Sequence, residues 1–217
     1  MKTDLQVQQD VIAELEWEPS LDAAGIGVEV KDGVVTLAGH VGSYSEKWDA
    51  ERAAQRVSGV KALAVEVEVA LPAFARRNDS DIASAARNVL EWTARLPRDS
   101  VKLMVEGGWI TLSGEVDWEF QRQVATATVR HLLGVTGVSD QITLKPNTSQ
   151  GLIQLDIEAA LRRRIRADAE HVVVEVCGDQ VTLRGTARGW AERELIKGSA
   201  WGTPGVRQVH DHMTVVF

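Results

Sequence analysis

A seven-residue pattern of alternating apolar residues, bounded by glycines, occurs three times and constrains the fold more than any other feature. The first copy spans residues 33–39, the second 108–114 and the third 179–185, where aspartate replaces the opening glycine. A glycine–valine pair stands twenty residues after each closing glycine. Regular spacing of this kind indicates repeated structural units. We therefore predict three tandem small domains, spanning residues 1–72, 77–147 and 148–217.

Each unit begins with a pattern typical of an amphipathic helix. Apolar residues recur every four positions and so lie on one helix face. These stripes are Val7, Val11 and Leu15, then Ile82, Ala86 and Leu90, then Ile153, Ile157 and Leu161. Two short alternating segments follow, joined in the first unit by Asp32-Gly33, a pair that favours a two-residue hairpin turn. A second helix over residues 43–57 and a last strand over residues 63–69 complete the unit.

This order of elements predicts an α+β fold. Each unit is helix–strand–strand–helix–strand, with two helices on one face of a three-stranded mixed sheet. The closing glycine of each pattern is expected to face the helices, where its missing side chain lets the second helix approach or permits a bulge. The glycine of each glycine–valine pair is expected to end the second helix as a left-handed cap. The six structural glycines are Gly39, Gly59, Gly114, Gly134, Gly185 and Gly205.

The glycine-bounded strand at residues 33–39 and the later Gly59-Val60 pair resemble the BON domain family, named for bacterial osmotically inducible and nodulation proteins. The resemblance covers almost the whole chain as three copies, and only the third copy departs from it, at Asp179. It implies a non-enzymatic module associated with osmotic and envelope stress and with phospholipid contact. One cytoplasmic branch of the family senses potassium, so a potassium-responsive protein is the alternative that the resemblance implies.

Charge and hydropathy narrow the class of partner. Residues 1–72 carry six basic and thirteen acidic residues, whereas residues 73–147 and 148–217 each carry nine of either sign and are neutral. This distribution lacks the basic footprint of a nucleic-acid-binding protein, so no nucleic-acid partner is expected. No apolar run approaches the roughly 18 residues of a membrane span, and the N-terminal residues lack the apolar stretch of a secretory signal. We expect a cytoplasmic protein, or a periplasmic one if an export signal has been removed.

The sequence offers no catalytic constellation. None of the five histidines shares a repeat position with another, and no Ser–His–acid or metal-ligand spacing surrounds them. His210 and His212 alternate on one strand and form a weak metal pair, although a solvent-facing strand explains them equally well. Cys177, at a hairpin end, is interpreted as a bystander rather than a nucleophile. We therefore expect no enzyme activity, no catalytic residue, no metal site and no cofactor.

Several tryptophans contradict the burial pattern of the repeat. Trp48, for example, aligns with Gln123 and Glu194 in the sister units, so its position lies on the surface of a unit. Large aromatic side chains there need another cover, either a neighbouring unit or a protein or membrane partner. The residues assigned to such an interface are Trp48, Trp109, Trp118 and Trp201. Trp17 and Trp92 share one position at the end of the first helix, where the third unit has Arg163.

Four arginines close the first helix of the third unit: Arg162, Arg163, Arg164 and Arg166. Cations there complement the helix dipole, so a solvated face is one interpretation. The other is a site for anionic lipid headgroups, because arginine binds phosphate oxygens in a forked geometry. The leading functional hypothesis is a module that contacts phospholipid or a membrane-associated partner. The alternatives are a cation-responsive protein, whose acidic first unit holds potassium or calcium, and a protein adaptor that uses its tryptophans.

Overall fold

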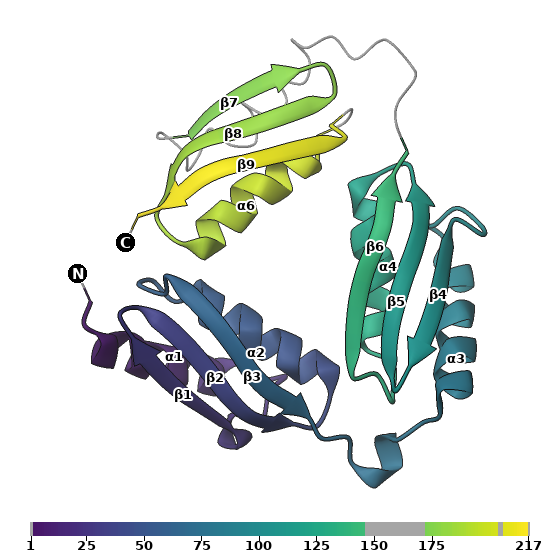
Figure 1. The fold of residues 1–217 in the computed structure, drawn as a ribbon, viewed down its shortest axis with the longest axis horizontal. Helices are drawn as coiled ribbons and strands as arrows, with labels where there is room; N and C mark the ends of the chain where they lie inside the picture. The colour runs from purple at the N-terminus through teal and green to yellow at the C-terminus, as the bar shows by residue number, and fades with distance from the viewer. Residues whose placement is uncertain (1, 146–171, 204–205, 217) are drawn as a thin grey trace.

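The computed structural model describes residues 2–145, 172–203 and 206–216, which form three successive α+β units (Figure 1). Unit 1 contains α1 (Asp4–Trp17), β1 (Ile26–Lys31), β2 (Val34–Val41), α2 (Tyr44–Arg56) and β3 (Ala62–Val69). Unit 2 contains α3 (Asp79–Trp92), β4 (Val101–Glu106), β5 (Trp109–Val116), α4 (Glu119–Arg130) and β6 (Gly137–Leu144). The described part of unit 3 contains β7 (Val172–Cys177), β8 (Gln180–Ala187), α6 (Trp190–Trp201) and β9 (Gln208–Val215). The predicted α+β fold of tandem units is confirmed; the first helical stripe of unit 3 lies outside the described residues.

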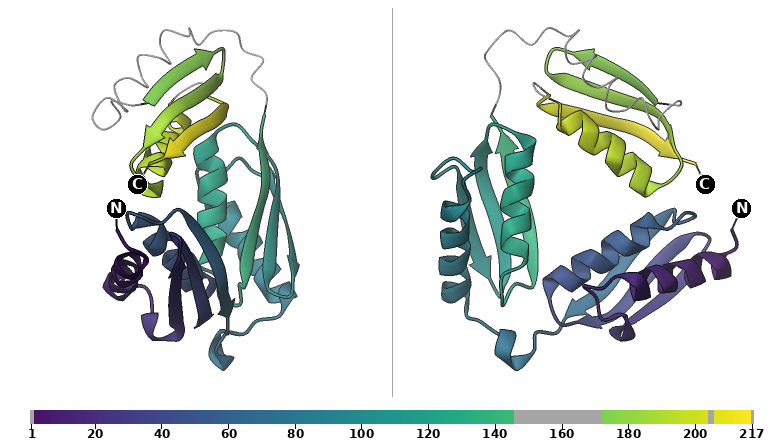
Figure 2. Two further views of the ribbon diagram at one scale, coloured as in Figure 1. Left: turned by 60° about the vertical axis from the view of Figure 1, so that its left-hand side comes forward. Right: turned by 180° about the vertical axis from the view of Figure 1, so that it is seen from behind.

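The three sheets share one topology and one register. In each, the middle strand runs antiparallel to the first and parallel to the last. In units 1 and 2 both helices cover the same face of the sheet and leave the other face uncovered (Figures 1 and 2). The closing glycines occupy equivalent places: Gly39 pairs with Ile26, Gly114 with Val101 and Gly185 with Val172. The register predicted from the repeat is therefore confirmed.

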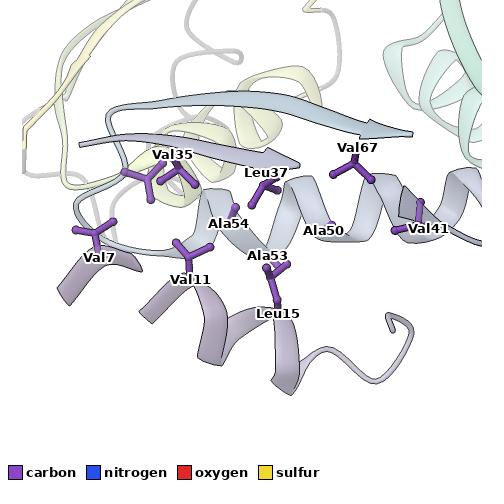
Figure 3. Close-up of a cluster of buried hydrophobic side chains, with 11 residues drawn as sticks. Val7, Val11, Leu15, Val35, Leu37, Val41, Ala50, Ala53, Ala54 and Val67 are labelled. Carbon is purple, nitrogen blue, oxygen red and sulfur yellow. The ribbon is translucent and has the colours of Figure 1, made fainter. Parts of the chain in front are cut away.

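The core of unit 1 lies between its helices and the covered face of its sheet (Figure 3). The predicted stripe of α1 packs there against small side chains of α2 and the inward residues of β2. These buried residues are Val7, Val11 and Leu15, then Ala50, Ala53 and Ala54, then Val35, Leu37 and Val41. Alanine on α2 keeps this helix close to the sheet.

The closing glycine of the repeat does not face the helices, so the expectation that it lets the second helix approach is wrong. Gly39 is exposed and has a φ of 129°, and a Cβ there would overlap the carbonyl oxygen of Gly25. Gly114, with a φ of 131°, meets the carbonyl oxygen of Ser100 in the same way. The missing side chain thus makes room for the backbone entering the first strand, in a conformation that residues other than glycine rarely adopt.

The glycine of the glycine–valine pair lies beyond the end of the second helix, which corrects its expected role as the cap. Helix α2 ends at Arg56, with Val57 as its C-cap. Gly59 follows with a φ of 104°, and a Cβ there would lie 2.9 Å from a methyl group of Val7. The equivalent Gly134 approaches Ile82 on α3 just as closely. The missing side chains of these two glycines leave room for the first helix of their units. Gly205 lies outside the described residues.

An aspartate at the start of the first helix holds the hairpin turn. The carboxylate of Asp79 accepts hydrogen bonds from the backbone N–H groups of Gly107 and Gly108, both at 2.9 Å. Asp4 holds the corresponding turn of unit 1 at 2.8 and 3.0 Å. The turn glycines Gly107 and Gly108 have φ values of 58° and 80°, as expected for the predicted two-residue turn. This contact ties the N-terminus of the helix to the far end of the sheet.

Replacing Asp79 with alanine is expected to destabilise unit 2 by roughly 1–3 kcal/mol, because two amide donors lose a charged acceptor. Chemical denaturation followed by circular dichroism measures the loss. Asp81→Ala is the matched control, since it removes a carboxylate from the same first turn and leaves the turn contacts intact. Equal losses in the two variants would mean that only the helix dipole is involved.

Candidate binding surfaces

The three units surround a common centre, with the second helices α2, α4 and α6 on the inner side (Figures 1 and 2). Helices α2 and α6 are in contact, so unit 3 returns to unit 1. Helix α3 lies on the outer side. The inner helices therefore form the junctions between units, and the first helix of unit 2 faces away from the centre.

Arg130, the last residue of α4, joins unit 2 to unit 1. Its guanidinium carbon lies 3.7 Å from the centroid of the Trp48 ring on α2. Also on α2, Ser45 has its Oγ 2.8 Å from Nδ1 of His131, the residue that follows α4. Tyr44, the first residue of α2, packs against the core of unit 2. The N-terminal half of α2 is thus the surface of unit 1 that meets unit 2.

Burial at this junction alters the protonation of its charged groups. It lowers the pKa of Arg130, and the nearby acidic groups Tyr44, Asp49 and Glu51 oppose the shift. Burial also raises the pKa of Glu51, against the opposing charges of Lys47 and Arg130. A cation held on an aromatic face and withdrawn from water gains up to about 2 kcal/mol from that contact. The junction therefore combines a sizeable attraction with a desolvation cost.

Arg207 joins unit 3 to unit 2. Its Nη1 donates hydrogen bonds to the backbone carbonyls of Asp117, at 3.1 Å, and Lys145, at 2.6 Å. Its guanidinium carbon lies 5.6 Å from the centroid of the Trp118 ring. One side chain from unit 3 thus binds two carbonyl oxygens and one aromatic ring of unit 2.

Arg122 contributes to the same junction from α4. Its guanidinium carbon lies 5.8 Å from the centroid of the Trp201 ring of unit 3, and its Nη2 lies 2.8 Å from Oε1 of Glu119. Glu119 is only 4% exposed, and burial raises the pKa of its carboxyl group against the opposing charge of Arg122. Oε2 of Glu119 has no hydrogen-bond partner among the described residues.

The sequence-predicted tryptophans fall into two groups. Each tryptophan in the first group meets an arginine of another unit; these are Trp48, Trp118 and Trp201. Trp109 instead lies within unit 2, on the uncovered sheet face, and its ring fills the place where a Cβ of Gly137 would stand. Its Nε1 donates to Ser139 Oγ at 2.8 Å, and 46% of the residue is exposed.

The arginines of the junctions were not predicted from the sequence. A signal for them is present in the repeat, because Arg130 of unit 2 and Trp201 of unit 3 occupy the same repeat position. Their partners, Trp48 and Arg122, lie one repeat position apart. At the first junction the preceding unit therefore contributes the tryptophan and the following unit the arginine, and at the second junction these roles are reversed.

The ends of the first helices carry the most exposed tryptophans of the described residues. Trp92 is 87% exposed and Trp17 is 83% exposed. Trp92 borders an open groove of about 1070 Å³ between the end of α3 and the start of β4. Apolar residues such as Leu96 and Leu103 line this groove together with five charged residues, which are Arg87, Arg98, Lys102, Glu91 and Asp99.

The surroundings of Trp17 have the opposite charge. The acidic residues Glu14, Glu16 and Glu18 flank it in the sequence. Arg56 of α2 forms ion pairs with Glu14 at 2.8 Å and with Glu18 at 2.9 Å, so this cation is already engaged. The two exposed tryptophans therefore share one repeat position but differ in electrostatic setting.

The predicted arginine cluster at residues 162–166 lies outside the described residues. Within the described part of the chain, no three His, Cys, Asp or Glu side chains converge as metal ligands. The rings of His210 and His212 are stacked with their centroids 6.5 Å apart. The potassium alternative stays a prediction. No helix among the described residues has both the length and the apolar character needed to cross a bilayer.

A sequence model of the BON domain matches the chain three times, at residues 3–70, 78–146 and 153–216. No curated protein sequence matches it. Among solved structures, the chain is similar to CdsD, a structural protein of the Type III secretion system of Chlamydia trachomatis. The identity is 14% and the TM-score 0.28, over 96% of this chain and 91% of that one.

A structure of the C-terminal domain of CdsD gives 15% identity and a TM-score of 0.27, over 100% of this chain and 99% of that one. The periplasmic domain of PrgH gives 10% identity and a TM-score of 0.23, over 88% of this chain and 95% of that one. TM-scores this low imply nothing about function.

Proposed function

The chain belongs to the BON domain family, and we propose that it is a non-enzymatic module that binds anionic phospholipid at the C-terminal end of α3 in unit 2 and through the arginine run of unit 3. The association of the family with osmotic and envelope stress supports a role under those conditions. A cytoplasmic location is part of the same proposal, because the cytoplasmic leaflet carries anionic lipid.

The observation that carries this proposal is the setting of Trp92. The ring is 87% exposed and borders a groove lined by leucines and by charged residues, of which three are basic (Arg87, Arg98 and Lys102) and two acidic (Glu91 and Asp99). Arg87 lies 3.7 Å from Glu91, so Arg98 and Lys102 are the cations left for a ligand. An indole has an apolar body and one polar edge, which suits the boundary between headgroups and acyl chains. Basic side chains around it attract anionic headgroups, at about 1 kcal/mol for each group near the surface.

The repeat extends this site to unit 3 and excludes it from unit 1. Unit 3 has Arg163 at the position of Trp92, within the run of four arginines over residues 162–166. Unit 1 keeps the aromatic ring as Trp17, but acidic residues flank it and the whole unit has a net charge of −7. Lipid contact is therefore assigned to units 2 and 3.

Trp92→Ala is expected to weaken binding to vesicles that contain phosphatidylglycerol by at least about tenfold, because a buried aromatic ring is worth roughly 1.5–3 kcal/mol. Co-sedimentation at low ionic strength measures the loss. Trp17→Ala is the matched control, with the same residue type, repeat position and exposure, and it should bind as the wild type does. Equal losses in the two variants would contradict the assignment to unit 2.

The arginine cluster is tested in the same assay. Glutamine at residues 162, 163, 164 and 166 removes four charges and should reduce binding further. If wild-type protein ignores anionic vesicles, the lipid proposal fails, and an adaptor that contacts protein through Trp92 and Trp109 becomes the better account.

A further inference from the structure

The junctions between units are built from the same repeat positions. Arg130 and Trp201 occupy one position and contact the preceding unit at Trp48 and Arg122, respectively. Head-to-tail contacts that repeat in this way close into a ring when the rotation between units permits it. Because α6 also contacts α2, unit 3 meets unit 1 and supplies the third junction (Figures 1 and 2).

One repeat position shows how the third junction differs from the others. Lys61, Thr136 and Arg207 are equivalent residues of units 1, 2 and 3. Arg207 fills its junction by donating to two carbonyl oxygens of unit 2. Thr136 lines a cavity beside Ala70 of unit 1 and makes no charged contact there. Lys61 lines the corresponding cavity of the third junction, and the residue of unit 3 beside that cavity is Arg188.

This third cavity concentrates positive charge. It has a volume of about 280 Å³, and Lys2, Lys61 and Arg188 line it. Its one lining carboxylate, Asp4, already accepts hydrogen bonds from two backbone amides of the unit 1 turn. Among the described residues, the guanidinium of Arg188 has no ion-pair partner. Like charges from two units therefore face one cavity, which opposes closure of the ring.

The lysines of the cavity are only partly engaged. Lys2 forms an exposed ion pair with Asp10 at 2.7 Å, and Lys61 Nζ donates to the carbonyl oxygen of Asp32 at 3.2 Å. An ammonium group has three donors, so each lysine keeps donors free for a ligand. Gly33 and Gly59 line the same cavity without side chains that would fill it. The site thus has room, donors and excess positive charge.

We propose that this cavity binds a phosphate group and that binding draws units 3 and 1 together. Arginine presents a planar fork to phosphate oxygens, and lysine supplies compact positive charge beside it. The bound anion neutralises the like charges on both sides of the junction, so it favours the closed ring. The phosphate comes either free from solution or as the headgroup of a phospholipid. This site shares no residue with the groove beside Trp92 at the C-terminal end of α3.

Isothermal titration of the full chain with inorganic phosphate tests the site. Wild-type protein is expected to bind one phosphate, and Lys61→Gln and Arg188→Gln are each expected to weaken binding by about tenfold or more. Lys31→Gln is the control, because Lys31 is an exposed lysine of unit 1 outside the cavity, and it should bind as the wild type does. Absence of binding to the wild type, or an equal loss in Lys31→Gln, overturns the proposal.

The source of the phosphate is identified by competition. Vesicles of phosphatidic acid in phosphatidylcholine that displace inorganic phosphate identify a headgroup as the ligand, whereas vesicles that do not displace it identify free phosphate. Trp92→Ala should bind inorganic phosphate as the wild type does. Loss of lipid binding beside Trp92 and loss of phosphate binding in this cavity are therefore distinguishable. Loss of phosphate binding in Trp92→Ala would contradict the separation of the two sites.

Discussion

Gly114→Ala should destabilise unit 2 by about 3 kcal/mol or more, because the new Cβ meets two obstacles at once. The φ of 131° lies in a region that side-chain-bearing residues rarely adopt, and the carbonyl oxygen of Ser100 occupies the place of the Cβ. For a unit of this size, a loss of 3 kcal/mol lowers the melting temperature by about 12–24 °C. Thermal unfolding followed by circular dichroism measures the shift.

Gly107→Ala separates these two causes. Gly107 has a φ of 58°, and nothing lies within 4 Å of a Cβ built there, so only the backbone conformation is unfavourable. Its expected cost is about 1 kcal/mol, the usual penalty for a side chain in the left-handed region. A Gly114→Ala variant that loses no more stability than Gly107→Ala would show that the chain entering β4 can move away.

Arg130→Ala is expected to weaken the docking of unit 2 on unit 1 by about 2–4 kcal/mol, because it removes a desolvated cation from the Trp48 ring and leaves Lys47 alone to oppose the charge of the half-buried Glu51. Each unit should keep its own secondary structure, since Arg130 lies at the helix end and contacts the neighbouring unit. Faster proteolysis in the linker over residues 71–78 is the expected readout.

A double-mutant cycle with Trp48→Ala measures the contact itself, and the coupling energy should exceed about 1 kcal/mol. Arg52→Ala is the control, because Arg52 also lies over the Trp48 ring, at 5.2 Å, but comes from α2 itself. Its removal should leave the linker as resistant as in the wild type. Additive effects of Arg130→Ala and Trp48→Ala would contradict an energetic role for the contact.

The elements of each unit could be predicted because the same burial pattern occurs in sister units. The second helix was expected over residues 43–57 and spans Tyr44–Arg56, with Ser43 as an N-cap whose side chain accepts from the N–H of Glu46. The last strand was expected over residues 63–69 and spans Ala62–Val69. In units of about 70 residues, few apolar positions can form the core, so their periodicity determines the elements.

The roles of the glycines and the junction contacts were harder to predict. Alternation along β2 assigns Gly39 to the buried face, but the neighbour that requires glycine is the carbonyl of Gly25, which only the folded chain brings close. The contact between Trp48 and Arg130 depends on how two rigid units dock, and no local propensity encodes that geometry. The exposure of Trp92 likewise follows from the direction of the end of α3, which the repeat pattern alone does not determine.

Binding of the intact protein to vesicles tests the central claim most directly. Co-sedimentation compares vesicles of phosphatidylcholine alone with vesicles that also contain phosphatidylglycerol, at low and at physiological ionic strength. The protein is expected to sediment with the anionic vesicles only, and less so at higher salt, because exposed charges are screened beyond about 8–10 Å. Failure to bind anionic vesicles at low ionic strength, or equal binding to both kinds at every salt concentration, would contradict the account.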